Sequence, residues 1–177
     1  MLLQYFKKKE NKDKDLAVFL YSQIIDSNII IARRNKNFLI DDFNTTFEIS
    51  TILLFCFFHT FKNEYKYKKI LQETMNIFIS DLDHSLRSIG ISDMQIGKYV
   101  KKYVKKFYFR LKLLEKLFDD FNNLDFSSYI SDLEILKIKN DQNIEEISLY
   151  LSERLIKLRK NLTNSNIKNI NLSNFFN

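Results

Sequence analysis

The sequence contains few of the residues that interrupt helices. It has no proline and two glycines among 177 residues, and these two residue types disfavour the interior of a helix most strongly. A chain of this length builds one hydrophobic core more readily than two. We therefore predict a single all-α domain, a compact bundle of about five to six helices.

Reactive residues are also scarce. The lone cysteine, Cys56, cannot form a disulfide within the chain and lies among Leu and Phe residues, which favours a reducing compartment and a buried, apolar role. His59 is three residues away, but an apolar environment would raise the pKa of the thiol and leave it inert. Two glycines cannot build a phosphate-binding loop, and no serine has an evident activating partner. The sequence therefore argues against an enzyme and offers no cofactor site.

A long hydrophobic run is absent as well. The longest apolar stretch, ISTILLFCFFHTF at residues 49–61, is shorter than the roughly 20 residues that span a bilayer. Since it is apolar on all faces, we predict a central helix buried on every side. The N-terminus lacks the apolar core of a secretory signal, and Glu10, Asp13 and Asp15 disfavour a transit peptide. We expect the chain to stay in the compartment where it is made.

Three regions follow from the composition along the chain. Residues 1–14 form a basic arm, either a frayed terminus or a single amphipathic turn, and residues 15–162 form the helical domain. Residues 163–177 are rich in Asn and Ser and predict a loose tail, in which Leu172, Phe175 and Phe176 could dock onto the domain.

Helical spacing of apolar residues places the elements within the domain. Capping-box pairs, Thr45 with Glu48 and Ser92 with Gln95, mark two helix starts. Gly90 stands where a helix would end, so residues 63–122 predict a helical hairpin. The predicted helices are residues 15–34, 45–61, 63–89, 93–122, 131–139 and 143–162.

Gly97 lies inside the fourth predicted helix. Glycine there costs about 1 kcal/mol relative to alanine. Either a close approach by another helix or a partner explains this residue, or the helix breaks at Gly97.

Asp81 and His84 share a helical face and raise the possibility of a metal site. A catalytic metal needs three or four protein ligands, and Asp83 lies four residues before Arg87, a spacing typical of an ion pair within a helix. We therefore predict no metal site.

The fourth predicted helix carries an unusual excess of positive charge. Glu115 is the only acid between Lys98 and Lys116. A solvated face usually mixes both signs, so the excess indicates an anionic partner: an acidic protein surface, phospholipid head groups or RNA. Stacking of RNA bases would require exposed aromatic residues among the cations. The eight cations of this stretch are Lys98, Lys101, Lys102, Lys105, Lys106, Arg110, Lys112 and Lys116.

The order of residues between 71 and 110 closely resembles the ubiquinol–cytochrome c chaperone family of bc1 complex assembly factors. The matching residues are Leu71-Gln72, Asp81-Leu82-Asp83, Ser85-Leu86-Arg87, Gly90, Asp93, Gly97-Lys98, Val100-Lys101, Phe107-Tyr108 and Arg110. Upstream matches are Tyr21, Asp41, Phe43, Phe47 and Glu48. The chain departs from the family pattern at Asn44, Thr45, Thr46, Leu53, Ser88 and Phe109.

The resemblance implies a non-enzymatic chaperone that binds newly made cytochrome b, has no haem of its own, and works at the cytoplasmic face of a bacterial inner membrane. A small partner protein accompanies some family members, and an anionic membrane surface is a further expected partner. The alternatives are an RNA- or ribosome-associated basic module and a peripheral membrane protein without a client.

Two sets of residues follow for this function. The expected client-contact residues are Lys98, Lys101, Lys105, Phe107, Tyr108 and Arg110. The four cations supply electrostatic contact, whereas Phe107 and Tyr108 lie between the core and the edge of the contact. The expected structural residues, which fix the geometry of the hairpin, are Asp81, Asp83, Arg87, Gly90, Asp93 and Gly97.

Overall fold

The computed structural model describes the backbone of residues 2–119, 123–164 and 171–176, and the prediction of an all-α fold is confirmed. Over these residues an isolated bridge between Phe38 and Leu136 is the only extended pairing. The helices are α1 (Leu2–Arg34), α2 (Phe43–Phe61), α3 (Lys68–Ser88), α4 (Asp93–Asp119), α5 (Asn123–Ser131), α6 (Asp141–Asn164) and α7 (Ser173–Phe176), with a 3-10 turn at Tyr65–Tyr67.

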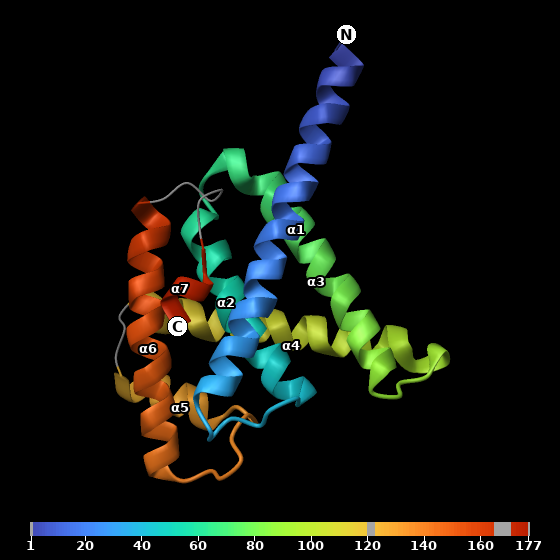
Figure 1. Cartoon of the computed structure of the whole chain (residues 1–177). Helices are drawn as coiled ribbons and strands as arrows, with labels where there is room; N and C mark the ends of the chain where they lie inside the picture. Colours follow the sequence, from blue (N-terminus) through green and yellow to red (C-terminus); the bar gives the residue numbers. More distant parts are fainter. Residues whose placement is uncertain (1, 120–122, 165–170, 177) are drawn as a thin grey trace.

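Helix α2 is the centre of the bundle, as its sequence predicts. Every residue from Phe47 to Phe57 is buried, and α1, α3, α4 and α6 all contact this helix. Figure 1 shows these helices arranged around it. Because no face of α2 reaches water between Phe47 and Phe57, all faces of this stretch can be apolar.

Helix α1 is longer than predicted. It begins at Leu2, so residues 2–14, expected as a separate basic arm, continue the helix and project beyond the body (Figure 1). Within the described chain one helical segment, Lys12–Arg34, is long and apolar enough to cross a membrane by length and composition alone. Ala17, Leu20 and Ile24 of this segment are buried in the bundle, a packing that also selects apolar residues.

Helices α3 and α4 form the predicted hairpin, and Gly90 makes the corner. Its φ of +96° is the left-handed conformation expected after the last helical turn. The Gly90 amide donates to the carbonyl of Arg87 at 2.9 Å, and the Ile91 amide donates to that of Leu86 at 3.1 Å. This is the Schellman arrangement, and α4 then begins at Asp93.

The start of α2 corrects one prediction. Asp42 is the N-cap, and its carboxylate accepts hydrogen bonds from the amide (2.8 Å) and hydroxyl (3.1 Å) of Thr45. Thr45 and Glu48 are fully buried one turn into the helix. The capping-box prediction was therefore wrong, because Glu48 is taken up by a buried ion pair with α4.

The region after α4 also differs from the prediction. Residues 123–131 are helical, whereas residues 132–140, predicted to contain a helix, are extended or bent. The amide of Leu39 donates to the carbonyl of Ile135 (2.9 Å), and that of Lys137 donates to Asn37 (2.9 Å). Pairing with the loop between α1 and α2 therefore satisfies the backbone of this segment without a helix.

The C-terminal apolar residues dock onto the helical domain, as the sequence analysis considered possible. Leu172 and Phe176 are fully buried and Phe175 is partly buried against the core, although α6 runs on to Asn164. Helix α7 contacts both α1 and α6. The remainder of the predicted tail, residues 165–170, lies outside the described residues.

Within the described residues, Gly97 shows neither a helix break nor a close approach by another helix. Helix α4 continues through it without a break, and a Cβ at this position would meet nothing within 4 Å. Among the described residues no other helix approaches Gly97 closely, so this part of the structure gives no reason for the glycine.

The two glycines of the hairpin should respond oppositely to alanine. Gly90→Ala should lower the free energy of unfolding by about 1–2 kcal/mol, because alanine is strained at a positive φ. Gly97→Ala should raise it by about 1 kcal/mol, because the helix is regular and the space is open. Urea unfolding of both variants tests this pair, and the same sign for both would contradict the geometry described.

Candidate functional site: the cationic face of α4

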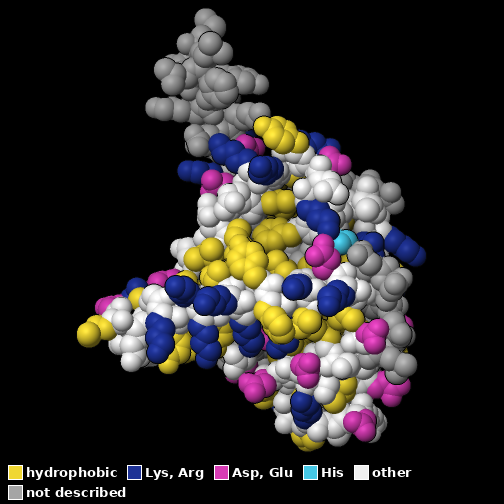
Figure 2. Space-filling model, turned by 180° about the vertical axis from the view of Figure 1, so that it is seen from behind, with side chains coloured by type: hydrophobic (Ala, Val, Ile, Leu, Met, Phe, Trp, Pro, Cys, Tyr) yellow, Lys and Arg dark blue, Asp and Glu magenta, His cyan; other side chains and the backbone are white. Residues whose placement is uncertain are grey.

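Helix α4 divides its residues between two faces. Ile96, Phe107, Leu114 and Phe118 are buried in the core. Figure 2 shows a band of Lys and Arg side chains that runs from the projecting end of the hairpin into the body. We call the exposed cations of α4 the cationic face: Lys98, Lys101, Lys102, Lys105, Lys112 and Lys116.

Some of the predicted client-contact residues lie on the cationic face of α4, and others lie on its buried face. Lys98, Lys101 and Lys105 are exposed, and so is Tyr108, whose exposed fraction is 56%. Phe109, beside Tyr108, is exposed to a similar extent. A partner can therefore reach three lysines and two neighbouring aromatic rings.

Phe107 and Arg110 correct the prediction. Phe107 is 0% exposed and Arg110 is 8% exposed, so neither side chain is accessible to a partner in this structure. Arg110 lies about half a turn away from Lys105 and Lys112 on the helix, because successive residues are separated by about 100°. Helical spacing applied to α4 as a whole would have separated Arg110 from the exposed lysines.

Arg110 instead balances the buried charge of Glu48. The Oε1 atom of Glu48, a residue that is 0% exposed, accepts hydrogen bonds from Nε (3.3 Å) and Nη2 (3.2 Å) of Arg110. Lys106 Nζ lies 2.8 Å from the same oxygen, and Arg110 Nη2 also donates to the Asp132 carbonyl at 3.4 Å. A carboxylate removed from water requires such partners, so this ion pair fixes α4 against α2 and the loop after α5.

Aromatic rings support the same junction. Phe43 and Phe47 of α2 each lie 5.0 Å, centroid to centroid, from Tyr103 of α4 in edge-on geometry. Phe78 of α3 lies 4.9 Å from Phe107. Tyr103 therefore packs against the core, and Tyr108 and Phe109 are the aromatic residues of α4 that are exposed.

The hairpin is held by an ion-pair bridge across its corner. Asp83 Oδ2 lies 2.6 Å from Arg87 Nε, at the spacing of four that the sequence predicts, and Arg87 also bonds to Asp93 at the start of α4. The hydrogen bond to Asp83 is the main cause of a raised pKa at Arg87. Arg87 thus joins the end of α3 to the start of α4.

Asp81 connects the hairpin to α1. The Tyr21 hydroxyl donates a hydrogen bond to Asp81 Oδ2 at 2.7 Å. Burial, followed by this hydrogen bond, raises the pKa of Tyr21 above its usual range. The Tyr21 and Asp81 positions, far apart in the sequence, therefore form one contact between two helices.

The reactive residues considered from the sequence do not assemble into a site. Burial raises the pKa of the Cys56 thiol to about 12, and the His59 ring packs 5.2 Å from that of Phe55. Asp81 is bonded to Tyr21, whereas His84 is exposed. Within the part of the chain that the structure describes, no three His, Cys, Asp or Glu residues are placed to hold a metal ion.

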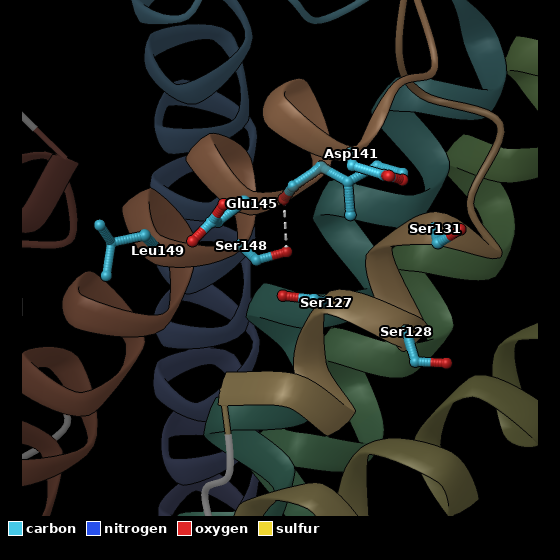
Figure 3. A pocket seen from close by; sticks show the side chains of 8 residues that line it. Ser127, Ser128, Ser131, Asp141, Glu145, Ser148 and Leu149 are labelled. Atoms are coloured by element: carbon cyan, nitrogen blue, oxygen red, sulfur yellow. Dashed lines mark hydrogen bonds between the residues drawn. The ribbon is translucent and has the colours of Figure 1, made fainter.

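A cavity of about 460 Å³ between α5 and α6 has no counterpart among the sequence predictions. Figure 3 shows its hydroxyl and carboxylate side chains, with Ser148 donating to the Ile144 carbonyl at 2.6 Å. Because serine and carboxylate residues are common on solvated helices, no sequence signal marked this cavity. It is lined by Ser127, Ser128, Ser131, Asp141, Ile144, Glu145, Ser148 and Leu149.

Comparisons with known proteins support the resemblance. The sequence model of the family described as ubiquinol-cytochrome C chaperone matches residues 38–129. The crystal structure of the Cbp3 homolog from Brucella abortus superposes with a TM-score of 0.79 at 20% identity, over 98% of this chain and 94% of that chain; it shows the same fold.

A further similarity involves a much larger protein. The chain is 27% identical over 150 residues to the protein DOP1 homolog PFC0245c of Plasmodium falciparum. The match covers 77% of this chain and 4% of that relative. An activity of that large protein therefore cannot be transferred to this chain.

The contrast between Arg110 and Lys105 gives a direct test of the two faces. Arg110→Met should lower the free energy of unfolding by about 1–3 kcal/mol, because it removes both guanidinium hydrogen bonds to the buried Glu48 carboxylate and leaves Lys106 as the remaining cation. Lys105→Met, on the exposed face, should change it by less than about 0.5 kcal/mol. Urea denaturation measures both, and equal effects would contradict the assignment of Arg110 to the core.

Proposed function

The chain belongs to the ubiquinol–cytochrome c chaperone family, and we propose that it is a non-enzymatic assembly chaperone of the ubiquinol–cytochrome c reductase (bc1) complex that binds newly made cytochrome b. The observation that carries this proposal is the cationic face of α4 within the matched residues. The proposed contact residues are Lys98, Lys101, Lys105 and Tyr108, joined by the exposed Phe109.

The charge of this face supports binding of a partner with acidic segments. Glu115, the single acid between Lys98 and Lys116, pairs with Lys62 of the loop after α2 at 2.7 Å, and this hydrogen bond lowers the pKa of Glu115. Between Lys98 and Lys116, therefore, no other acid of α4 balances the lysines, and Asp93 at the start of the helix bonds to Arg87. Such a surface accelerates encounter with an anionic partner and fixes its orientation.

The exposed rings of Tyr108 and Phe109 support binding of a partly apolar client. Large aromatic residues contribute strongly at protein interfaces, because they bury much area with few rotatable bonds. A newly made membrane protein presents both polar loops and apolar segments before its assembly is complete. A surface that combines lysines with two exposed rings suits such a client better than it suits a small-molecule substrate.

We further propose that the protein acts at the cytoplasmic face of the inner membrane, where its client is inserted, and that a small partner protein assists it. The open space at Gly97 is compatible with a partner that approaches α4 closely. The cavity between α5 and α6 is a second surface that such a partner could occupy.

Reversal of two central charges tests the proposed contact. Lys101→Glu together with Lys105→Glu should reduce site-specific crosslinking to newly made cytochrome b by at least about tenfold, because attraction becomes repulsion. Since both residues are exposed, the melting temperature should shift by less than about 2 °C. The matched control is Lys137→Glu with Lys157→Glu, two exposed lysines remote from α4 in sequence.

Crosslinking also separates the proposal from its alternative. Recovery of RNA in place of cytochrome b would favour an RNA- or ribosome-associated module, for which the exposed Tyr108 and Phe109 rings would be stacking surfaces. Salt dependence does not discriminate, because both interactions are electrostatic. Unchanged cytochrome b crosslinking by the folded double variant would exclude the central lysines as its contact.

A further inference from the structure

The end of the α3–α4 hairpin exposes apolar side chains. Met94, in the first turn of α4, is 98% exposed, and Ile89, at the end of α3, is 56% exposed. In Figure 1 this end of the hairpin projects from the body, and Figure 2 shows hydrophobic surface at its extremity. Within the described chain, therefore, almost no other residue covers Met94. This apolar side chain is exposed to water at a convex tip.

Positive charge lies directly behind this tip. Lys98 and Lys102, one and two turns after Met94, are exposed. The nearest acids, Asp83 and Asp93, are both bonded to Arg87, so their charges are partly balanced within the hairpin. His84 is also exposed on α3. The tip thus presents apolar groups first and cations behind them.

We propose that the tip of the α3–α4 hairpin docks onto an anionic lipid bilayer, with Met94 and Ile89 entering the interface and Lys98 and Lys102 binding lipid phosphates. Apolar side chains at the boundary between head groups and acyl chains, with lysines directed to the head groups, are the arrangement by which peripheral proteins bind membranes. This docking does not depend on the client and extends beyond client binding.

The shape and chemistry of the tip favour a bilayer over RNA or a folded protein. A convex tip can enter a fluid interface, whereas docking to a folded protein would require a complementary pocket. RNA recognition relies on aromatic stacking and polar contacts, which Met94 and Ile89 do not supply. The lysines complement the negative potential of anionic lipid.

Hydrogen bonds and ion pairs hold the tip of the hairpin in a fixed conformation. The Schellman bonds at Gly90 close the corner, and Arg87 joins Asp83 to Asp93 across it. Met94 and Ile89 are therefore held on a preformed corner, and docking needs little ordering of the backbone.

Vesicle flotation of the full-length protein tests the proposal. The chain should float with vesicles of equal parts phosphatidylglycerol and phosphatidylcholine, and much less with phosphatidylcholine alone. Lys98→Gln with Lys102→Gln should weaken partition into the anionic vesicles about 25-fold, at about fivefold per lysine. Lys137→Gln with Lys157→Gln, exposed elsewhere, should leave it unchanged.

The apolar part of the tip has its own variant and control. Ile89→Asn with Met94→Asn should reduce flotation at least tenfold, whereas Ile138→Asn, which alters another exposed isoleucine, should not. Wild-type protein that stays with the unbound fraction, or tip variants that float as wild type does, would overturn the proposal. The crosslinking phenotype of Lys101 and Lys105 is measured separately, so failure of one proposal leaves the other testable.

A fluorescent label provides a second readout that does not depend on a disruptive substitution. Cys56 is fully buried, so a thiol-reactive, environment-sensitive dye will label Met94→Cys selectively. Its emission should shift to the blue on anionic vesicles and be quenched by spin-labelled lipid. The same dye at Ile138→Cys should not respond, and an unresponsive dye at position 94 would exclude insertion of the tip.

Discussion

The buried carboxylate of Glu48 is the constraint on which the functional surface depends. Glu48 lies in the stretch of the central helix, residues 47–57, in which every residue is buried, and a charge there is tolerated only beside cations. Arg110 and Lys106 supply them and thereby set the rotation of α4 about its axis. Once these two residues face inward, Lys98, Lys101 and Lys105 face solvent. A core ion pair thus determines which cations a partner can reach.

The residues that carry the family resemblance are largely the residues that make contacts between helices. Tyr21 bonds to Asp81, Glu48 pairs with Arg110, and Arg87 joins two aspartates across the corner of the hairpin. The shared pattern therefore specifies the placement of the helices more directly than it specifies a contact with a client. The surface that these contacts leave exposed is cationic along α4 and apolar at its tip.

The fold was predictable where periodicity or a special backbone conformation leaves a strong signal. Helix α2 was evident from its uniform apolarity, and the hairpin corner from Gly90. The extended segment 132–140 was not, because its backbone is satisfied by a loop nearly one hundred residues earlier, a pairing that local pattern does not encode. Arg110 was misassigned to the surface for a similar reason: its partner, Glu48, lies on another helix and looked like a capping residue.

We propose that this chain is needed to assemble the bc1 complex. The most direct measurement is deletion of its gene in a strain that makes the complex, followed by quantification of assembled complex and its haem b. We predict loss of both, with newly made cytochrome b failing to accumulate, and recovery when the gene is restored. A normal amount of assembled complex in the deletion strain would contradict it.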